Sequence, residues 1–188
     1  MLGYIIDNKL SNEEHCKYII KKSRKTLSAI RRFSSKASKA SATKVLKSVL
    51  IGRSAYAGFL YLHNKSQRKR IEIMIMKAVR VVAKKKLSDK IKNSILLKSL
   101  NVCPIETIYK RQTILEVCKW SEKWPQVFQK MSEKTRGGQN KSFRPVGIKN
   151  KTKKSFLNNM VKLWNDVNHL VTEVDTIKKK RQIKRIFR

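Results

Sequence analysis

The distribution of charge constrains this chain more than any other feature of its sequence. No Asp or Glu occurs between Glu14 and Glu72, while that interval holds sixteen Lys and Arg residues. The 188-residue chain has 46 basic and 12 acidic residues, a formal net charge of +34. Because compaction of like charges opposes folding, an anionic partner is expected. Nucleic acid is the first candidate, a membrane surface the second and an acidic protein the third.

The two ends of the chain and its cysteines further limit the class of protein. The chain closes on "KKKRQIKRIFR", a basic block of the kind found in interaction surfaces and tails. The three cysteines, Cys16, Cys103 and Cys118, lack metal-binding spacing and indicate reduced thiols of an intracellular protein, in the nucleus or the cytoplasm. No apolar run reaches membrane-spanning length, and the N-terminus does not show the pattern of a secretory signal.

Hydrophobic periodicity predicts an all-α fold: a basic multi-helix bundle with one short N-terminal strand and a C-terminal helical extension. Four regions are expected: the strand and turn at 1–10, a helical domain at 11–133, a flexible basic linker at 134–154 and the extension at 155–188. Helices are predicted over about 11–33, 41–62, 67–84, 88–100, 105–123, 126–133 and 155–170, with a last one from 172. Ser11 and Glu14 have the spacing of a capping box. A lone strand is unstable in water, so "LGYIID" is expected to pair with strands outside this chain.

The predicted second helix has Val45, Val49, Gly52, Tyr56 and Phe59 on its buried face, and the third has Ile71, Ile75, Ala78 and Val82. Four aromatic residues, Phe33, Tyr56, Trp120 and Trp164, are assigned to the core rather than to stacking on bases.

Five segments in order resemble a known family. "LGYIIDNKLSNEEHCKYIIKKSRKTLSAIRRF", "VLKSVLIGRSAYAGFLY", "KSQRKRIEIMIMKAVRVVAKKK", "LNVCPIETIYKRQTIL" and "SFLNNMVKLWNDV" are similar to the end of the palm, the thumb and the C-terminal region of non-LTR retrotransposon reverse transcriptases. One departure is Val167-Asn168, where that family usually has Leu-Pro.

The resemblance implies a thumb that grips template RNA or an RNA–DNA hybrid, in a truncated fragment whose parent is an RNA-directed DNA polymerase. Polymerase chemistry needs paired aspartates that hold Mg²⁺. The family carries them on a palm hairpin, and no Asp-Asp pair occurs here. We therefore expect no catalysis by this chain alone and no cofactor of its own, since Mg²⁺ would belong to the absent palm.

The predicted partners are RNA, an RNA–DNA hybrid or DNA, held through phosphates, with no small-molecule substrate. The candidate contact residues lie in three basic clusters. They are Lys17, Lys21, Arg24, Arg31, Arg32, Arg68, Lys69, Arg70, Lys84, Lys85 and Lys86.

Two alternatives stay open. The chain could be an independent basic RNA-binding component of a ribonucleoprotein, which would fold as a defined monomer without a palm. It could also bind a membrane surface through the helix that contains "IKKKRQIKRIFR", although the apolar side of that helix is small. The sequence does not determine the oligomeric state.

Overall fold

The computed structural model describes residues 3–8, 11–86, 88–123, 156–167, 170–171 and 176–187. All regular secondary structure in these residues is helical. The chain divides into two compact units, Met1–Glu106 and Thr107–Arg188. The predicted helix at 126–133 and the predicted linker at 134–154 lie outside the described residues.

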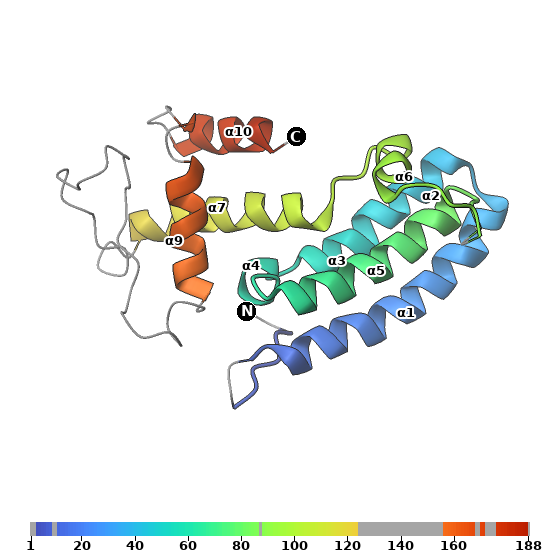
Figure 1. Cartoon of the computed structure of the whole chain (residues 1–188), viewed down its shortest axis with the longest axis horizontal. Coiled ribbons are helices and arrows are strands. Elements are labelled where there is room, and N and C mark those ends of the chain that lie inside the picture. The colour runs from blue at the N-terminus through green and yellow to red at the C-terminus, as the bar shows by residue number, and fades with distance from the viewer. Residues whose placement is uncertain are drawn as a thin grey trace. The chain divides into compact units, whose positions relative to one another are not determined.

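The first unit is built on three rows of helix (Figure 1). Helix α1 (Glu13–Lys36) packs along α5 (Lys65–Val82), and the two run in the same direction because the segment between them crosses back. That returning row consists of α2 (Lys39–Val45), the π-helix η1 (Leu46–Ile51), α3 (Gly52–Ala55) and α4 (Gly58–Tyr61). A short helix, α6 (Asn93–Ser99), packs on α5.

The core of this unit is formed in part by one face each of α1 and α5. Cys16, Ile19 and Ile30 of α1 are at most 3% exposed. The face predicted for the third helix is confirmed: Ile71, Ile75, Ala78 and Val82 are all buried in α5. Such buried apolar stripes, rather than intrinsic helix propensity, supply most of the stability of helices in proteins.

The predicted face of the second helix is wrong in part: Phe59 is buried as predicted, at 6% exposure, but most of the face is not. Val49 and Tyr56 are exposed, 39% and 45%, and the buried side chains are instead Leu46, Leu50 and Ile51. The cause is a change of helical period. The π-helix η1 has five-residue spacing, so it rotates the residues after Val45 away from the positions that a regular α-helix would give them.

The same row of helix is also interrupted, at Ala57. This residue has a left-handed backbone with φ of 51°, which ends the preceding turn before α4 begins. The buried Tyr61 hydroxyl donates a hydrogen bond to the carbonyl of Ser54 across the break. The predicted continuous helix over 41–62 is therefore a series of short helical segments.

The predicted N-terminal strand is not formed in the described residues, where 3–8 have no regular structure. This agrees with the physical expectation that a strand without a partner makes no ladder of hydrogen bonds. The capping box is also absent: α1 begins at Glu13 after Asn12, whose φ is 61° and whose side chain makes no capping hydrogen bond. Ser11 Oγ instead accepts a hydrogen bond from the Glu13 amide at 3.2 Å.

The second unit contains nearly all of α7 (Ile105–Lys123), together with α9 (Phe156–Val167) and α10 (Thr176–Ile186). The bounds of α7 agree with the predicted helix over 105–123. Each helix contributes fully buried apolar side chains, such as Ile114 of α7, Met160 of α9 and Ile183 of α10. The predicted caps of the last two helices, Ser155 and Thr172, lie outside the described residues.

Candidate nucleic-acid interface

Four of the predicted contact residues form an outward-facing group on α1. Lys21, Arg24, Arg31 and Arg32, here called the α1 cationic strip, are all exposed. Among the residues that the structure describes, none of the four makes an ion pair. Ser23 and Ile30 on the same helix are buried, so the helix presents its core stripe to one side and these cations to the other.

The fifth predicted residue of α1, Lys17, differs from the strip. Its ammonium lies 2.8 Å from the Glu14 carboxylate, and both side chains are more than half exposed. This carboxylate raises the pKa of Lys17. A phosphate at Lys17 would have to compete with that neighbouring carboxylate, so Lys17 is a weaker candidate than the strip.

Arg70 binds within the chain, where it joins the N-terminal ends of α1 and α5. Its guanidinium forms an ion pair with Glu13, and this hydrogen bond lowers the pKa of Glu13. Beside it, the buried Gln67 donates to the carbonyl of Ser11 at 2.9 Å. Arg70 therefore has a structural function, because its ion pair with Glu13 joins the start of α1 to the first part of α5.

Arg68 and Lys69 also have partners in the chain. Arg68 donates to the Leu62 carbonyl at 2.8 Å and so satisfies a carbonyl at the end of α4. Lys69 lies 3.5 Å from Glu72 in an exposed pair on α5. Of the three predicted contact residues on α5, Lys69 is the most exposed, and exposed pairs of this kind contribute little to stability.

The three lysines after α5 are exposed, and their backbone has a defined shape. The Lys84 amide donates to Val81 and the Lys85 amide to Arg80, at 3.1 and 3.0 Å. With Lys84 at φ of 53°, these are the two hydrogen bonds of a Schellman motif. A lysine here occupies the left-handed position that usually carries glycine.

Arg80, which was not among the predicted site residues, fixes the loop that follows it. Its guanidinium donates to the carbonyls of Lys86, Asp89 and Ile91 and to Asn93 Oδ1, at 3.2–3.4 Å. This loop replaces the start of the helix predicted over 88–100, so α6 begins only at Asn93. The only sequence signal for this role was an arginine near the end of a long apolar helix.

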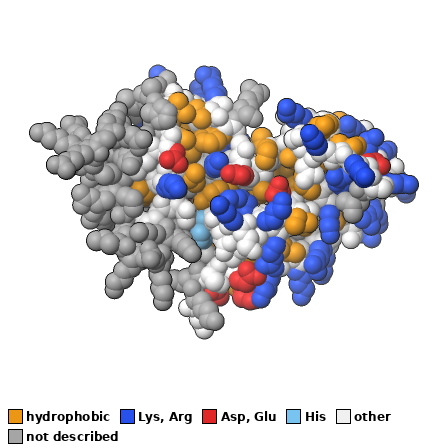
Figure 2. Space-filling model, viewed as in Figure 1, with side chains coloured by type: hydrophobic (Ala, Val, Ile, Leu, Met, Phe, Trp, Pro, Cys, Tyr) orange, Lys and Arg blue, Asp and Glu red, His pale blue; other side chains and the backbone are white. Residues whose placement is uncertain are grey.

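Other exposed cations add to the basic surface of the first unit (Figure 2). They were not among the predicted contact residues, although they lie in the same interval without acidic residues. They are Lys22, Lys25, Lys36, Lys39, Lys44, Lys47 and Lys65. The Lys22 ammonium lies 4.6 Å from the centre of the Tyr18 ring, within range of a cation–π contact.

The start of α1 holds a buried aromatic cluster rather than a reactive site. His15 is fully buried, stacks on Tyr4 at 4.0 Å between ring centres and meets the edge of Tyr61 at 5.2 Å. Its Nδ1 accepts a hydrogen bond from the Ile5 amide at 3.3 Å. Burial lowers the pKa of His15, so the imidazole is neutral near pH 7.

The core assignment of the four aromatic residues is wrong for two of them. Phe33 and Tyr56 are 44% and 45% exposed. Trp164 is buried as predicted, and Trp120 is half-buried. Phe33 directly follows Arg31 and Arg32 in the sequence, so α1 exposes an aromatic ring as well as the cations of the strip.

Three other properties of the described part are relevant to function. It contains no cluster of three His, Cys, Asp or Glu side chains that could hold a metal ion. None of its helices is long and apolar enough to cross a membrane. Comparison with known proteins gives no match to a family model, to a curated protein or to a solved structure.

Proposed function

We propose that this chain binds the sugar–phosphate backbone of RNA, an RNA–DNA hybrid or DNA through the α1 cationic strip and Lys84–Lys86. The observation that carries the proposal is the strip itself. Lys21, Arg24, Arg31 and Arg32 are exposed on one helix, in a region of sequence that contains no acidic residue from 15 to 71. Surface cations normally alternate with carboxylates, and a surface without them attracts polyanions.

The physical mechanism is the release of counterions. Each lysine or arginine that neutralises a phosphate frees a condensed cation, which gives affinity without reading the base sequence. The strip extends over 12 residues of α1, or about 17 Å at 1.5 Å per residue, so it reaches several successive phosphates. Because α1 and α5 point the same way, Lys84–Lys86 follow α5 toward the end of the unit where α1 also ends.

In the resemblance to non-LTR reverse transcriptases, this surface takes the place of the thumb and acts inside the cell. The proposal assigns no catalysis and no Mg²⁺ site to this chain. The binding mechanism stands on the charge and exposure of the named residues and would hold equally for an independent RNA-binding protein.

A salt titration with two charge-matched variants tests the proposal. The first variant replaces the four strip residues with alanine. The second replaces four exposed cations of α10 with alanine, namely Lys180, Arg181, Lys184 and Arg185. Both lower the net charge by four, and alanine preserves the helix. Binding of single-stranded RNA, an RNA–DNA hybrid and duplex DNA is measured from 50 to 200 mM salt.

For the strip variant, we expect the slope of log K against log salt to become shallower by about 3, because each lost phosphate contact accounts for about 0.7–0.9. The α10 variant should keep most of the wild-type slope. Equal losses in the two variants would show that net charge alone determines binding, and a flat salt response of the wild type would refute phosphate contacts altogether.

A further inference from the structure

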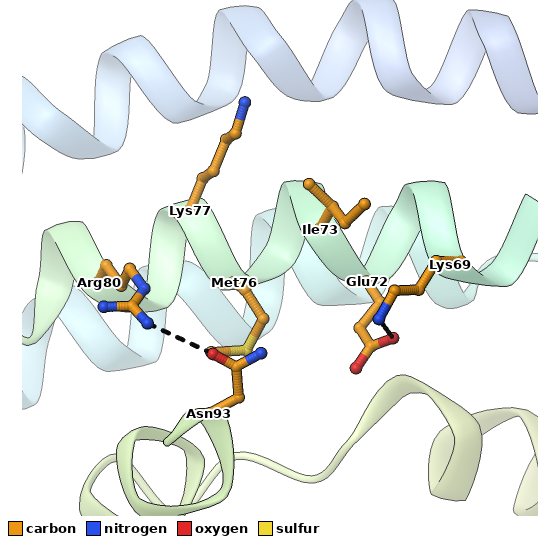
Figure 3. Close-up of a pocket in the computed structure, with 7 residues that line it drawn as sticks. All are labelled: Lys69, Glu72, Ile73, Met76, Lys77, Arg80 and Asn93. Atoms are coloured by element: carbon orange, nitrogen blue, oxygen red, sulfur yellow. Dashed lines mark hydrogen bonds and ion pairs between the residues drawn. The ribbon is translucent and has the colours of Figure 1, made fainter. Parts of the chain in front are cut away.

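A small pocket lies on the outer side of α5, facing α6, and no residue of the α1 cationic strip lines it (Figure 3). Its volume is about 190 Å³. Ile73, which is 48% exposed, and Met76, which is 6% exposed, supply apolar surface. The pocket thus exposes an apolar side chain on α5 between lysines of the same helix.

The size of the pocket suits an occupant with one flat ring system. An apolar cavity of about 150 Å³ holds a benzene molecule, whereas drug-sized ligands need about 300 Å³ or more. A volume of about 190 Å³ lies between these and suits a single aromatic heterocycle. The flexible thioether of Met76 makes favourable contact with an aromatic ring.

The polar side chains around the pocket suit a ring that is joined to phosphates. Two lysines, Lys69 and Lys77, line the pocket. They are eight positions apart on α5, so their backbones are about 12 Å apart along the helix. Lys77 is exposed and, among the described residues, makes no ion pair. These two cations can neutralise a phosphate on either side of an inserted base.

Two further groups of the pocket can recognise the edge of a base. Glu72 has a carboxylate, an acceptor of hydrogen bonds from an amino group. Asn93 offers its amide nitrogen, while its Oδ1 already accepts from Arg80. Arg80 in turn is held by the loop carbonyls, so this end of the pocket is rigid without a ligand. A carboxylate would weaken a pure phosphate site, and it has a clear use if the occupant carries an amino group.

We propose that this pocket receives one unpaired nucleobase with an exocyclic amino group, of which cytosine is the simplest, while Lys69 and Lys77 bind the flanking phosphates. The inference rests on the proposed function and adds a base preference to it. Next along α5, a second pocket of about 420 Å³ shares Lys69 and Glu72 and is also lined by Lys65, Arg68 and Glu106. The exposed Lys65 of that pocket continues the path for a strand that leaves the base site.

The test uses one RNA duplex with a single bulged nucleotide in three forms: cytidine, uridine and an abasic residue. Stacking of one base is worth about 1–3 kcal/mol, so the wild type should bind the cytidine bulge about tenfold more tightly than the abasic bulge. The uridine bulge should lie between them, because uracil has no amino group for Glu72. Equal binding of the three forms by the wild type overturns the inference without any variant.

Two matched variants locate the effect. Ile73→Ser removes exposed apolar surface from the pocket, and Ile95→Ser makes the same change at an isoleucine of α6 that is 56% exposed and does not line it. Ile73→Ser should bring the cytidine bulge to within about twofold of the abasic one, while Ile95→Ser should keep the wild-type ratio. Equal ratios in the two variants would place the base elsewhere.

The preference for cytidine over uridine tests the carboxylate. Glu72→Ala should abolish this ratio, although its overall affinity should increase, because Lys69 then loses its partner. A preserved ratio would refute the role of Glu72. If the wild type shows no base dependence but the strip variant still loses its salt slope, the pocket proposal fails and the proposed function stands. If the strip variant is unaffected, the proposed function fails.

Discussion

Replacement of Lys84 by glycine separates the folding role of this position from its proposed binding role. Lys84 is the left-handed residue of the Schellman motif that ends α5, with φ of 53°. A left-handed backbone costs an L-residue about 1–2 kcal/mol, whereas glycine adopts it freely. The two motif hydrogen bonds are donated by backbone amides, so Lys84→Gly retains both of them.

The magnitude follows from two opposing effects. Relief of the left-handed strain is worth about 1–2 kcal/mol. The greater conformational freedom of glycine in the unfolded chain reduces that gain in stability by about 0.4–1 kcal/mol. We therefore expect Lys84→Gly to raise the free energy of unfolding by about 0.5–1 kcal/mol and, for a chain of this size, to raise Tm by about 1–4 °C.

The same substitution should weaken nucleic-acid binding, because it removes one cation from the proposed surface. The slope of log K against log salt should fall by about 0.7–0.9. Lys85→Gly is the matched control: it removes the same charge from the adjacent position, whose φ is not positive. This control should lose a similar amount of binding and gain no stability.

Urea unfolding followed by circular dichroism measures the first effect, and the salt-titrated binding assay measures the second. A variant that is both more stable and a weaker binder would support both roles of Lys84. If Lys84→Gly is no more stable than Lys85→Gly, the left-handed strain at this position is refuted. If both variants bind as tightly as the wild type, the lysines after α5 are not phosphate contacts.

Two further predictions concern the interior and the loop. Burial lowers the pKa of His15 below that of the unfolded chain, so stability should be complete above about pH 6.5 and decrease as the pH falls below it. Urea unfolding at pH 7.5 and 5.5 should show a smaller loss of unfolding free energy for His15→Gln than for the wild type. His63, whose pKa is also lowered by burial, accounts for the loss that remains. An equal loss in the two proteins would contradict the assignment to His15. Arg80→Lys should destabilise the chain by about 1 kcal/mol, since a lysine ammonium cannot donate to several loop carbonyls as the guanidinium does. Hydrogen exchange in residues 84–93 should also become faster. Unchanged exchange there would show that Arg80 does not hold the loop.

The sequence predicted long regular helices well and interrupted helices poorly. The buried face of α5 was predicted correctly because Ile71, Ile75 and Ala78 keep one period throughout. The buried face of the row from α2 to α4 was predicted poorly, because a π-helical segment changes the period and leaves Val49 exposed. Nothing in the apolar pattern distinguishes the two cases, because the hydrogen-bond spacing is decided by packing against α1 and α5.

In the candidate interface, too, the sequence predicted what depends on one helix and missed what depends on contacts between segments. Exposure of Lys21 and Arg31 followed from the amphipathic pattern of one helix, which the sequence contains in full. Arg68 and Arg70 looked equivalent to them in sequence, yet their partners Leu62 and Glu13 are brought near only by folding. A cation is available for a ligand only after the ion pairs and hydrogen bonds within the chain have been formed.

The sequence by itself determined the helical class, the stripes of the two long helices and the excess of positive charge, because these depend on composition and on spacing within one segment. Only the tertiary structure decided which cations stay unpaired, where a helix changes its period and that Arg80 gathers the carbonyls of a loop to close one end of a pocket. These features depend on side chains that meet across different segments, and the distances between segments are set by the packing of the whole unit.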